Sequence, residues 1–308
     1  MATPYVSAAM LLAQPAGLAW NVVPTLTATG PEQQAQLAQE CWKATSAIDR
    51  YCHQPLRATA VTETETGPGA PRVAVDRLSG VASLITRQWP VTEVAAVQVS
   101  PARSFPETWT LVPANQVRIA RPVLVPAAGI PVTGPSGGNK ISVAPGWITW
   151  MHGPRYWSVM TSTTSGYPHA SLTQDAAADA TTLHVDDVTG WNAIGAGWAY
   201  DSVATEPVLV SAAAATSPVQ LPGVGGMVQA GPGTLTLSSP LQNAHAAGTV
   251  ISAMPADLIR AAALQAAVQA LEMIDAIATQ SMSGQMAGST GALASEVECI
   301  LGDYRAII

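Results

Sequence analysis

The last part of the chain, residues 255–308, limits the possible folds most, because it predicts helices that are too apolar to stand alone in water. Apolar residues recur there at helical spacing, with small alanines between them that let another helix approach closely. We predict helices over 255–281 and 293–305, with a flexible glycine-rich break at 283–291. Other parts of the chain or neighbouring copies must cover these helices. The apolar stripe of the first helix consists of Leu264, Val268, Leu271 and Ile274.

The composition indicates a protein with much contact surface. Only 11% of the residues are charged, where about 25% is typical. The hydrophobic share is 48% and comes mainly from alanine and valine rather than from aromatic residues. A surface with so few charges suits burial against identical copies or other partners.

The charges are unevenly distributed. Between Arg155 and Arg260 the sequence has no lysine or arginine at all. Such a stretch lacks the basic footprint that binds nucleic-acid phosphates, so we expect it to repel DNA rather than hold it. Within 170–254 its carboxylates are Asp175, Asp179, Asp186, Asp187, Asp201 and Glu206.

The order of the patterns predicts an α+β protein. Residues 1–30 form an extended arm, interrupted by proline and glycine. A helix over 31–53 begins at Pro31, which suits a first helical turn, and short antiparallel strands follow up to 169. The region 31–169 and the C-terminal helices and tail at 255–308 together make up a helical core with an antiparallel β region. The acidic segment 170–254 reads as a second, inserted β-rich domain.

Motifs for catalysis are weak. The segment 134–138 matches G-x-S-x-G, but it lacks the preceding strand and following helix of a nucleophile elbow, so we interpret it as a hairpin loop. The glycine run 223–226 has no helix pattern after it and no basic neighbour, which argues against a phosphate loop. We predict that the protein is not an enzyme.

Motifs for ligand binding are equally weak. His184 lies close to Asp186 and Asp187, but adjacent strand residues point to opposite faces, so an acidic turn is favoured over a metal site. Three tryptophans could stack on sugars, although tryptophans within strands more often belong to a core or an interface. We predict no cofactor and no metal. The tryptophans are Trp147, Trp150 and Trp157.

Neither membrane insertion nor disulfide bonding is expected. The apolar run 6–18 has no basic region before it, and the span 258–280 carries charged residues, so the sequence predicts a soluble protein. Cys41 and Cys52 share a helix face but lie about 16 Å apart, too far for a disulfide. We interpret the cysteines as small buried apolar residues.

Seven short segments follow one another in an order that is found in a known family. In this order they resemble the head-to-tail adaptor (connector) proteins of tailed bacteriophages, and the first resembles those of actinobacteriophages. The resemblance covers about 1–168 and 255–308, whereas 170–254 has no counterpart in small adaptors. The segments are 5–12, 44–57, 62–65, 88–94, 164–168, 255–258 and 300–305.

The resemblance implies a structural protein of the virion neck, assembled in the cytoplasm of the host bacterium. Adaptors of this family form a homo-oligomeric, commonly dodecameric ring between the portal protein and a tail-side neck or tail-terminator protein. DNA passes through the lumen without specific binding, the helices form the ring wall, and no membrane is involved. The C-terminal segment often docks on the portal, so the candidate portal or subunit interface consists of Leu293, Val297, Ile300, Leu301, Tyr304, Arg305, Ile307 and Ile308.

Two alternatives remain open from the sequence. The chain could be another virion structural protein, acting in tail completion or as a minor capsid component. A particle-borne carbohydrate-binding protein is the other alternative, and it requires exposed tryptophans such as Trp147 or Trp150.

Overall fold

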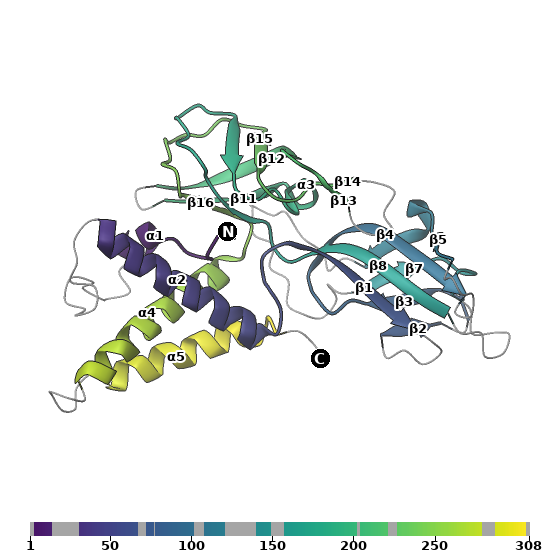
Figure 1. Ribbon diagram of the computed structural model, residues 1–308, viewed down its shortest axis with the longest axis horizontal. Helices are drawn as coiled ribbons and strands as arrows, with labels where there is room; N and C mark the ends of the chain where they lie inside the picture. Colours follow the sequence, from purple (N-terminus) through teal and green to yellow (C-terminus); the bar gives the residue numbers. More distant parts are fainter. Residues whose placement is uncertain are drawn as a thin grey trace.

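The computed structural model describes residues 3–13, 31–66, 72–76, 78–101, 108–120, 140–148, 157–201, 204–220, 227–278 and 287–305. It has three parts, a helical unit, a β-sandwich and a β-barrel (Figure 1). Among the described residues, strands contain more residues than helices do. The prediction of a fold built on a helical core is therefore wrong. The reason is that each β part buries a hydrophobic cluster of its own, so the helices enclose one of three clusters among the described residues.

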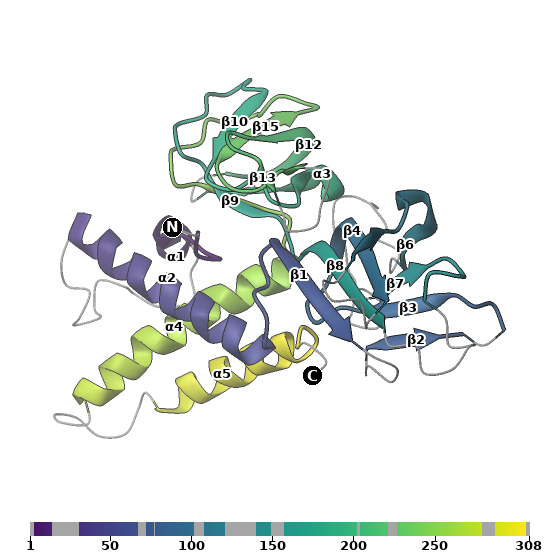
Figure 2. The same ribbon diagram turned by 45° about the vertical axis from the view of Figure 1, so that its right-hand side comes forward.

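The helical unit combines elements from both ends of the sequence. Helix α2 crosses α4, and α5 packs along α4 (Figure 2). Buried alanines of α4, among them Ala262 and Ala266, let the helices approach closely. Helix α5 begins earlier than the predicted start at 293 and includes part of the predicted break. The helices are α1 (Ala8–Ala13), α2 (Pro31–Cys52), α4 (Ala256–Ala278) and α5 (Ala287–Gly302).

The β-sandwich consists of two four-stranded sheets that enclose one cluster around Val97, Ile141 and Val159. Its first sheet has the order β1-β8-β4-β5 and its second the order β2-β3-β7-β6, with antiparallel neighbours throughout. The strands are β1 (Thr59–Thr66), β8 (Trp157–Ser165), β4 (Val91–Pro101), β5 (Thr110–Leu111), β2 (Val73–Val75), β3 (Ala82–Ile85), β7 (Lys140–Val143) and β6 (Val117–Ala120), with the 3₁₀ helix η3 (Ala114–Gln116) before β6.

The β-barrel is a six-stranded sheet in the order β10-β15-β12-β11-β16-β9. Its outer strands meet, because the Thr173 amide donates to the His184 carbonyl at 2.9 Å and the Asp186 amide to the Ser171 carbonyl at 3.0 Å. This contact closes the sheet on itself and removes its free edges. The strands are β9 (His169–Ser171), β10 (Thr182–Val185), β11 (Ala196–Tyr200), β12 (Thr205–Ala215), β15 (Gly233–Leu237) and β16 (Val250–Ser252); helix α3 (Trp191–Ile194) and the pair β13 (Val219–Gln220) and β14 (Met227–Val228) lie on its connections.

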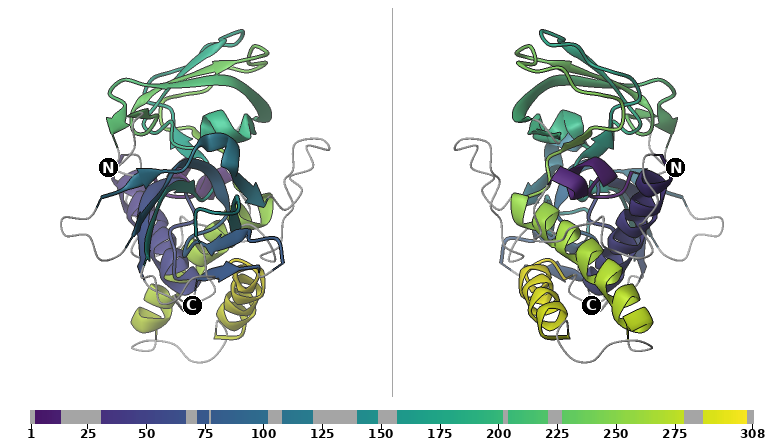
Figure 3. Two further views of the ribbon diagram at one scale, coloured as in Figure 1. Left: turned by 90° about the vertical axis from the view of Figure 1, so that its right-hand side faces the viewer. Right: turned by 90° about the vertical axis from the view of Figure 1, so that its left-hand side faces the viewer.

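The chain enters and leaves the barrel at one place. Strands β9 and β16 are antiparallel neighbours, with Ser171 opposite Val250 and His169 opposite Ser252. The preceding strand β8 runs into β9, and α4 follows β16 after a short turn. Residues 3–13, which we call the strap, lie between α2 and the barrel (Figure 3). The three parts of the molecule therefore meet around the strap.

Candidate functional site

Tyr5 of the strap connects the helical unit to the start of the sandwich. Its side chain is 1% exposed, and its hydroxyl donates to the Asp49 carboxylate of α2. The same oxygen accepts the backbone N–H of Leu56 at 2.9 Å. The Tyr5 backbone N–H donates to the Thr45 hydroxyl at 3.0 Å. Burial raises the pKa of both Tyr5 and Asp49. These bonds satisfy the polar groups that Tyr5 buries.

His169 of β9 connects the strap to the barrel. Its Nε2 lies 2.9 Å from the Pro4 carbonyl, and its Nδ1 lies 2.9 Å from the Ser252 hydroxyl. Because a carbonyl only accepts, Nε2 carries the proton and Nδ1 accepts from Ser252. The Tyr5 ring meets the imidazole edge to face at 5.6 Å. Burial lowers the pKa of His169 from 6.5 to about 4.

This burial predicts acid sensitivity. The unfolded chain takes up a proton at His169 near pH 6.5, whereas the folded chain does so only near pH 4. Between these values the unfolded state binds more protons, so His169 lowers the free energy of unfolding as the pH falls. The full loss is about 3 kcal/mol. Urea unfolding from pH 7.5 to 4.5 should therefore show a shallower pH dependence for His169→Gln than for the wild-type chain. Parallel curves would contradict this prediction.

The C-terminal end of α5 is fixed to the sandwich and to α4. The rings of Trp89 and Tyr304 stack with centroids 5.9 Å apart and planes at 10°. Gln54, which follows the end of α2, joins them. Its side-chain carbonyl accepts the Trp89 backbone N–H at 2.9 Å, and its amide donates to the Tyr304 carbonyl at 3.2 Å. The Tyr304 hydroxyl donates to the Asp257 carboxylate at 2.9 Å. Burial raises the pKa of the Tyr304 phenol.

Gly166 lies where three backbone segments come closest. Its N–H donates to the Pro90 carbonyl at 2.8 Å, and the next residue, Tyr167, donates to the Leu56 carbonyl at 2.8 Å. The backbone at Gly166 has φ +100°, and a Cβ there would lie 2.3 Å from the Arg57 carbonyl oxygen. Only glycine fits this conformation and this contact.

These contacts form one junction, which we define as Tyr5, Asp49, Gln54, Leu56, Trp89, Pro90, Gly166, Tyr167, His169, Asp257 and Tyr304. Six of the seven segments that carry the family resemblance contribute residues to it. The seventh, 62–65, lies on β1, where Glu63 accepts the Arg87 N–H at 3.0 Å. Segments that are far apart in the sequence thus meet at one place in the fold.

Most of the predicted interface residues lie within the helical unit itself. Val297, Leu301 and Tyr304 are at most 7% exposed, and Leu293 and Ile300 pack against the same cluster. These five side chains hold α5 to the rest of the chain.

The other predicted interface residues lie near the end of the sequence. Arg305 is exposed; its guanidinium lies 5.2 Å from the centre of the Tyr51 ring and 3.1 Å from His53 Nε2. Ile307 and Ile308 fall outside the described residues.

The sequence candidates for chemistry are not brought together. Asp186 accepts the backbone N–H of Ser171 on β9, Asp187 accepts that of Thr189, and His184 is exposed on β10. No group of three or more His, Cys, Asp or Glu in the described ranges could hold a metal ion.

The remaining candidates are only partly described. Trp147 packs against the sandwich cluster, and its indole N–H donates to Gln116. The motifs at 134–138 and 223–226 and residue Trp150 lie outside the described residues, as does the side chain of Trp157.

Sequence reasoning missed the central residues of the junction. Tyr5 belongs to a resembling segment, but no local pattern reveals its partners. His169 carries no motif, and it contacts the Pro4 carbonyl 165 positions away. Gly166 could have been found, because glycine between Ser165 and Tyr167-Pro168 marks a turn with positive φ.

Comparison with known proteins adds no assignment. No protein-family model and no curated protein matches the chain. Among the described residues, no helix is both long and apolar enough to cross a membrane.

Proposed function

We propose that the chain is a structural head-to-tail connector of a tailed bacteriophage, which forms a ring between the portal and the tail and lets DNA pass through its lumen. The observation that carries this proposal is the junction. Each resembling segment is weak alone, but six of them supply side chains or backbone groups of the junction. Segments with such a shared structural role are the ones a common fold would preserve.

Charge and surface composition support the same proposal. The barrel has no lysine or arginine. Most of its described carboxylates accept hydrogen bonds from the chain itself; Glu206, for example, accepts the Gln242 backbone N–H at 2.8 Å. A surface of this kind offers no electrostatic hold on passing DNA. The outward side of β12 carries small or apolar residues, among them Pro207 and Leu209, which suit contact with other subunits.

The oligomeric state of the purified chain tests whether the protein forms a ring. We expect native mass spectrometry and electron-microscopy class averages to show closed rings of one stoichiometry, because a connector must surround the DNA path. A strictly monomeric chain, or an isologous dimer with no ring at any protein concentration, would contradict the ring.

The position of the chain in the virion tests whether the protein joins the head to the tail. A short epitope tag in the barrel, detected by labelled antibody on assembled virions, should place the chain at the neck between head and tail. Untagged virions give the background. Label at the far end of the tail or on the capsid faces would instead favour a tail-completion or minor capsid protein.

A further inference from the structure

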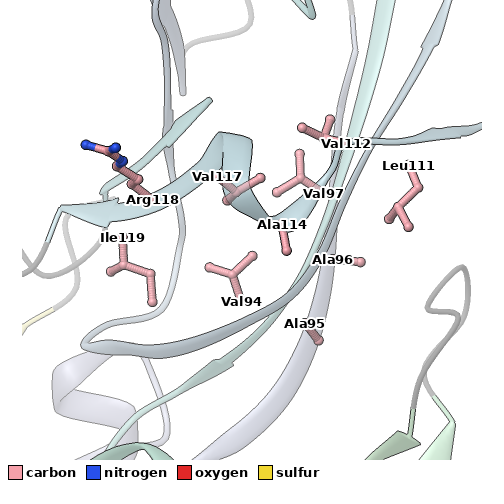
Figure 4. Close-up of a pocket in the computed structure, with 10 residues that line it drawn as sticks. All are labelled: Val94, Ala95, Ala96, Val97, Leu111, Val112, Ala114, Val117, Arg118 and Ile119. Carbon is pink, nitrogen blue, oxygen red and sulfur yellow. The ribbon is translucent and has the colours of Figure 1, made fainter. Parts of the chain in front are cut away.

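The barrel buries a group of titratable side chains, whereas the sandwich has an apolar hollow. The hollow has a volume of about 440 Å³ and lies between β4, β5, η3 and β6 (Figure 4). The described residues that line it are aliphatic apart from Arg118. In the barrel, one histidine and two acidic residues lie together at one end, and we call them the clamp. The clamp consists of His245, Asp201 and Glu206.

His245 anchors the loop 238–249, which joins β15 to β16. Most of this loop is exposed, but the His245 side chain is 0% exposed. The His245 backbone pairs with Ala176 of the β9–β10 turn through two hydrogen bonds of 2.8 Å. Its side chain reaches the end of β11 and the start of β12, where Nδ1 lies 3.1 Å from an Asp201 oxygen and Nε2 lies 2.7 Å from a Glu206 oxygen. Three connections at this end of the barrel are therefore joined through one residue.

The hydrogen bonds of the clamp require a charged histidine. A carboxylate only accepts hydrogen bonds, so each ring nitrogen of His245 must donate a proton. Imidazole is ordinarily a stronger base than a carboxyl group, which places the shared proton on the ring. Burial raises the pKa of Glu206, but the hydrogen bonds from the Gln242 backbone and from His245 outweigh burial and hold this pKa below its usual value. His245 is therefore an imidazolium between two carboxylates.

The surroundings of the clamp are acidic. Lysine and arginine are absent from the whole of 170–254. Of the other histidines of the barrel, His169 is bonded to the strap and His184 is exposed on β10. The β9–β10 turn, which faces the loop, adds the exposed residues Asp175 and Asp179. A single buried positive group therefore holds the loop among carboxylates.

We propose that the clamp is a pH-sensitive switch, which holds the loop 238–249 while His245 is protonated and releases it when His245 loses a proton. After this loss, one ring nitrogen presents a lone pair to a carboxylate, so repulsion replaces a hydrogen bond. The clamp is therefore closed at low pH and opens as the pH rises. This effect is opposite in sign to that of His169. The switch goes beyond the proposed function and does not depend on it.

Hydrogen–deuterium exchange of the full-length chain measures the opening of the loop. The backbone amides of Gln242 and Asn243 donate to Glu206, so their protection reports the closed clamp. We compare exchange from about pH 5.5 to 9, a range that spans the usual ionisation of histidine. After correction for the intrinsic pH dependence of exchange, this protection should fall roughly 10- to 100-fold, because a hydrogen bond to a charged group is lost. The amides of β15 should keep their protection.

Three variants show which group controls the loop. His245→Gln removes the charge, so the loop should exchange rapidly at every pH. His184→Gln, at the exposed histidine of β10, is the matched control and should behave like the wild-type chain. Asp201→Asn keeps the shape of the clamp but removes one carboxylate, so the loop should open at a lower pH than in the wild-type chain.

Three results would overturn the switch. The first is loop protection that does not change with pH in the wild-type chain. The second is the wild-type pH dependence in His245→Gln, and the third is an unchanged opening pH in Asp201→Asn. If His245→Gln does not fold, the wild-type chain and Asp201→Asn still decide. Ring formation plays no part in these measurements, so the switch and the connector are tested separately.

Discussion

Gly166→Ala should leave little or no stably folded chain, with a loss of about 4 kcal/mol or more in the free energy of unfolding. The new Cβ would lie 2.3 Å from the Arg57 carbonyl oxygen and 2.8 Å from the Leu56 carbonyl oxygen. Both are backbone atoms of the segment that leads from α2 into β1, so neither can move aside without breaking the bond between Tyr167 and Leu56. The junction would have to open.

Gly146→Ala is the matched control. Gly146 has φ +95°, close to that of Gly166, but nothing lies within 4 Å of its added Cβ. The substitution should therefore cost only the strain of a left-handed alanine, about 1–2 kcal/mol. Urea unfolding followed by tryptophan fluorescence measures the free energy of unfolding of both variants. Similar losses in the two variants would show that backbone strain, rather than the close approach at the junction, sets the stability.

Excision of the barrel should leave the rest of the chain folded. Leu172 and Thr249 lie side by side, because the Leu172 N–H donates to the Thr249 carbonyl at 2.9 Å. Replacing 173–248 by an Asn-Gly turn would convert β9 and β16 into a hairpin and keep His169 beside Ser252. The chain would lose the contact between Thr3 and Asp186 and the packing of Tyr200, so we expect a stability lower by about 1–3 kcal/mol.

Two measurements check this excision. The helical signal near 222 nm should stay, and unfolding of the remaining chain should stay cooperative. Adding Gly166→Ala to the excised chain gives the negative control, because it opens the junction that remains. Loss of the helical signal in the excised chain alone would mean that the barrel is required for the helical unit to fold.

The helices could be predicted because local signals agree with tertiary packing. Pro31 and Glu32 mark the start of α2, and it ends at Cys52, close to the predicted 53. Helix α5 differs, because Gly288 and Ser289 predict a break and yet lie within it. Its residues Val297 and Leu301 pack into the helical cluster, and such packing outweighs weak local preference.

Strand β8 could not be predicted, although it is the central strand of the first sheet. It reads Trp-Ser-Val-Met-Thr-Ser-Thr-Thr-Ser, without alternation of apolar and polar residues. Two of its buried hydroxyls find partners on β1: Ser162 with Thr62 at 3.1 Å and Ser158 with Thr66 at 3.3 Å. Such pairing depends on residues about one hundred positions away, which no local pattern reveals.

The closure of the barrel and the position of the C-terminal residues could not be predicted from the sequence either. Closure depends on four backbone groups, those of Ser171, Thr173, His184 and Asp186, and backbone groups leave no signal in residue type. The family resemblance predicts a portal or subunit interface at the C-terminal residues, and the sequence alone does not tell whether the chain itself or a neighbour covers their apolar side chains.

The assembly of the helical unit from both ends of the sequence also sets an order of events during synthesis. The sandwich and the barrel draw all their strands from residues 59–252, so both can fold while the ribosome is still making α4. The helical unit must wait, because α2 packs against α4 and α5, which follow the last barrel strand in the sequence. A nascent chain therefore carries α2 without α4 and α5 until both of these helices have been synthesised.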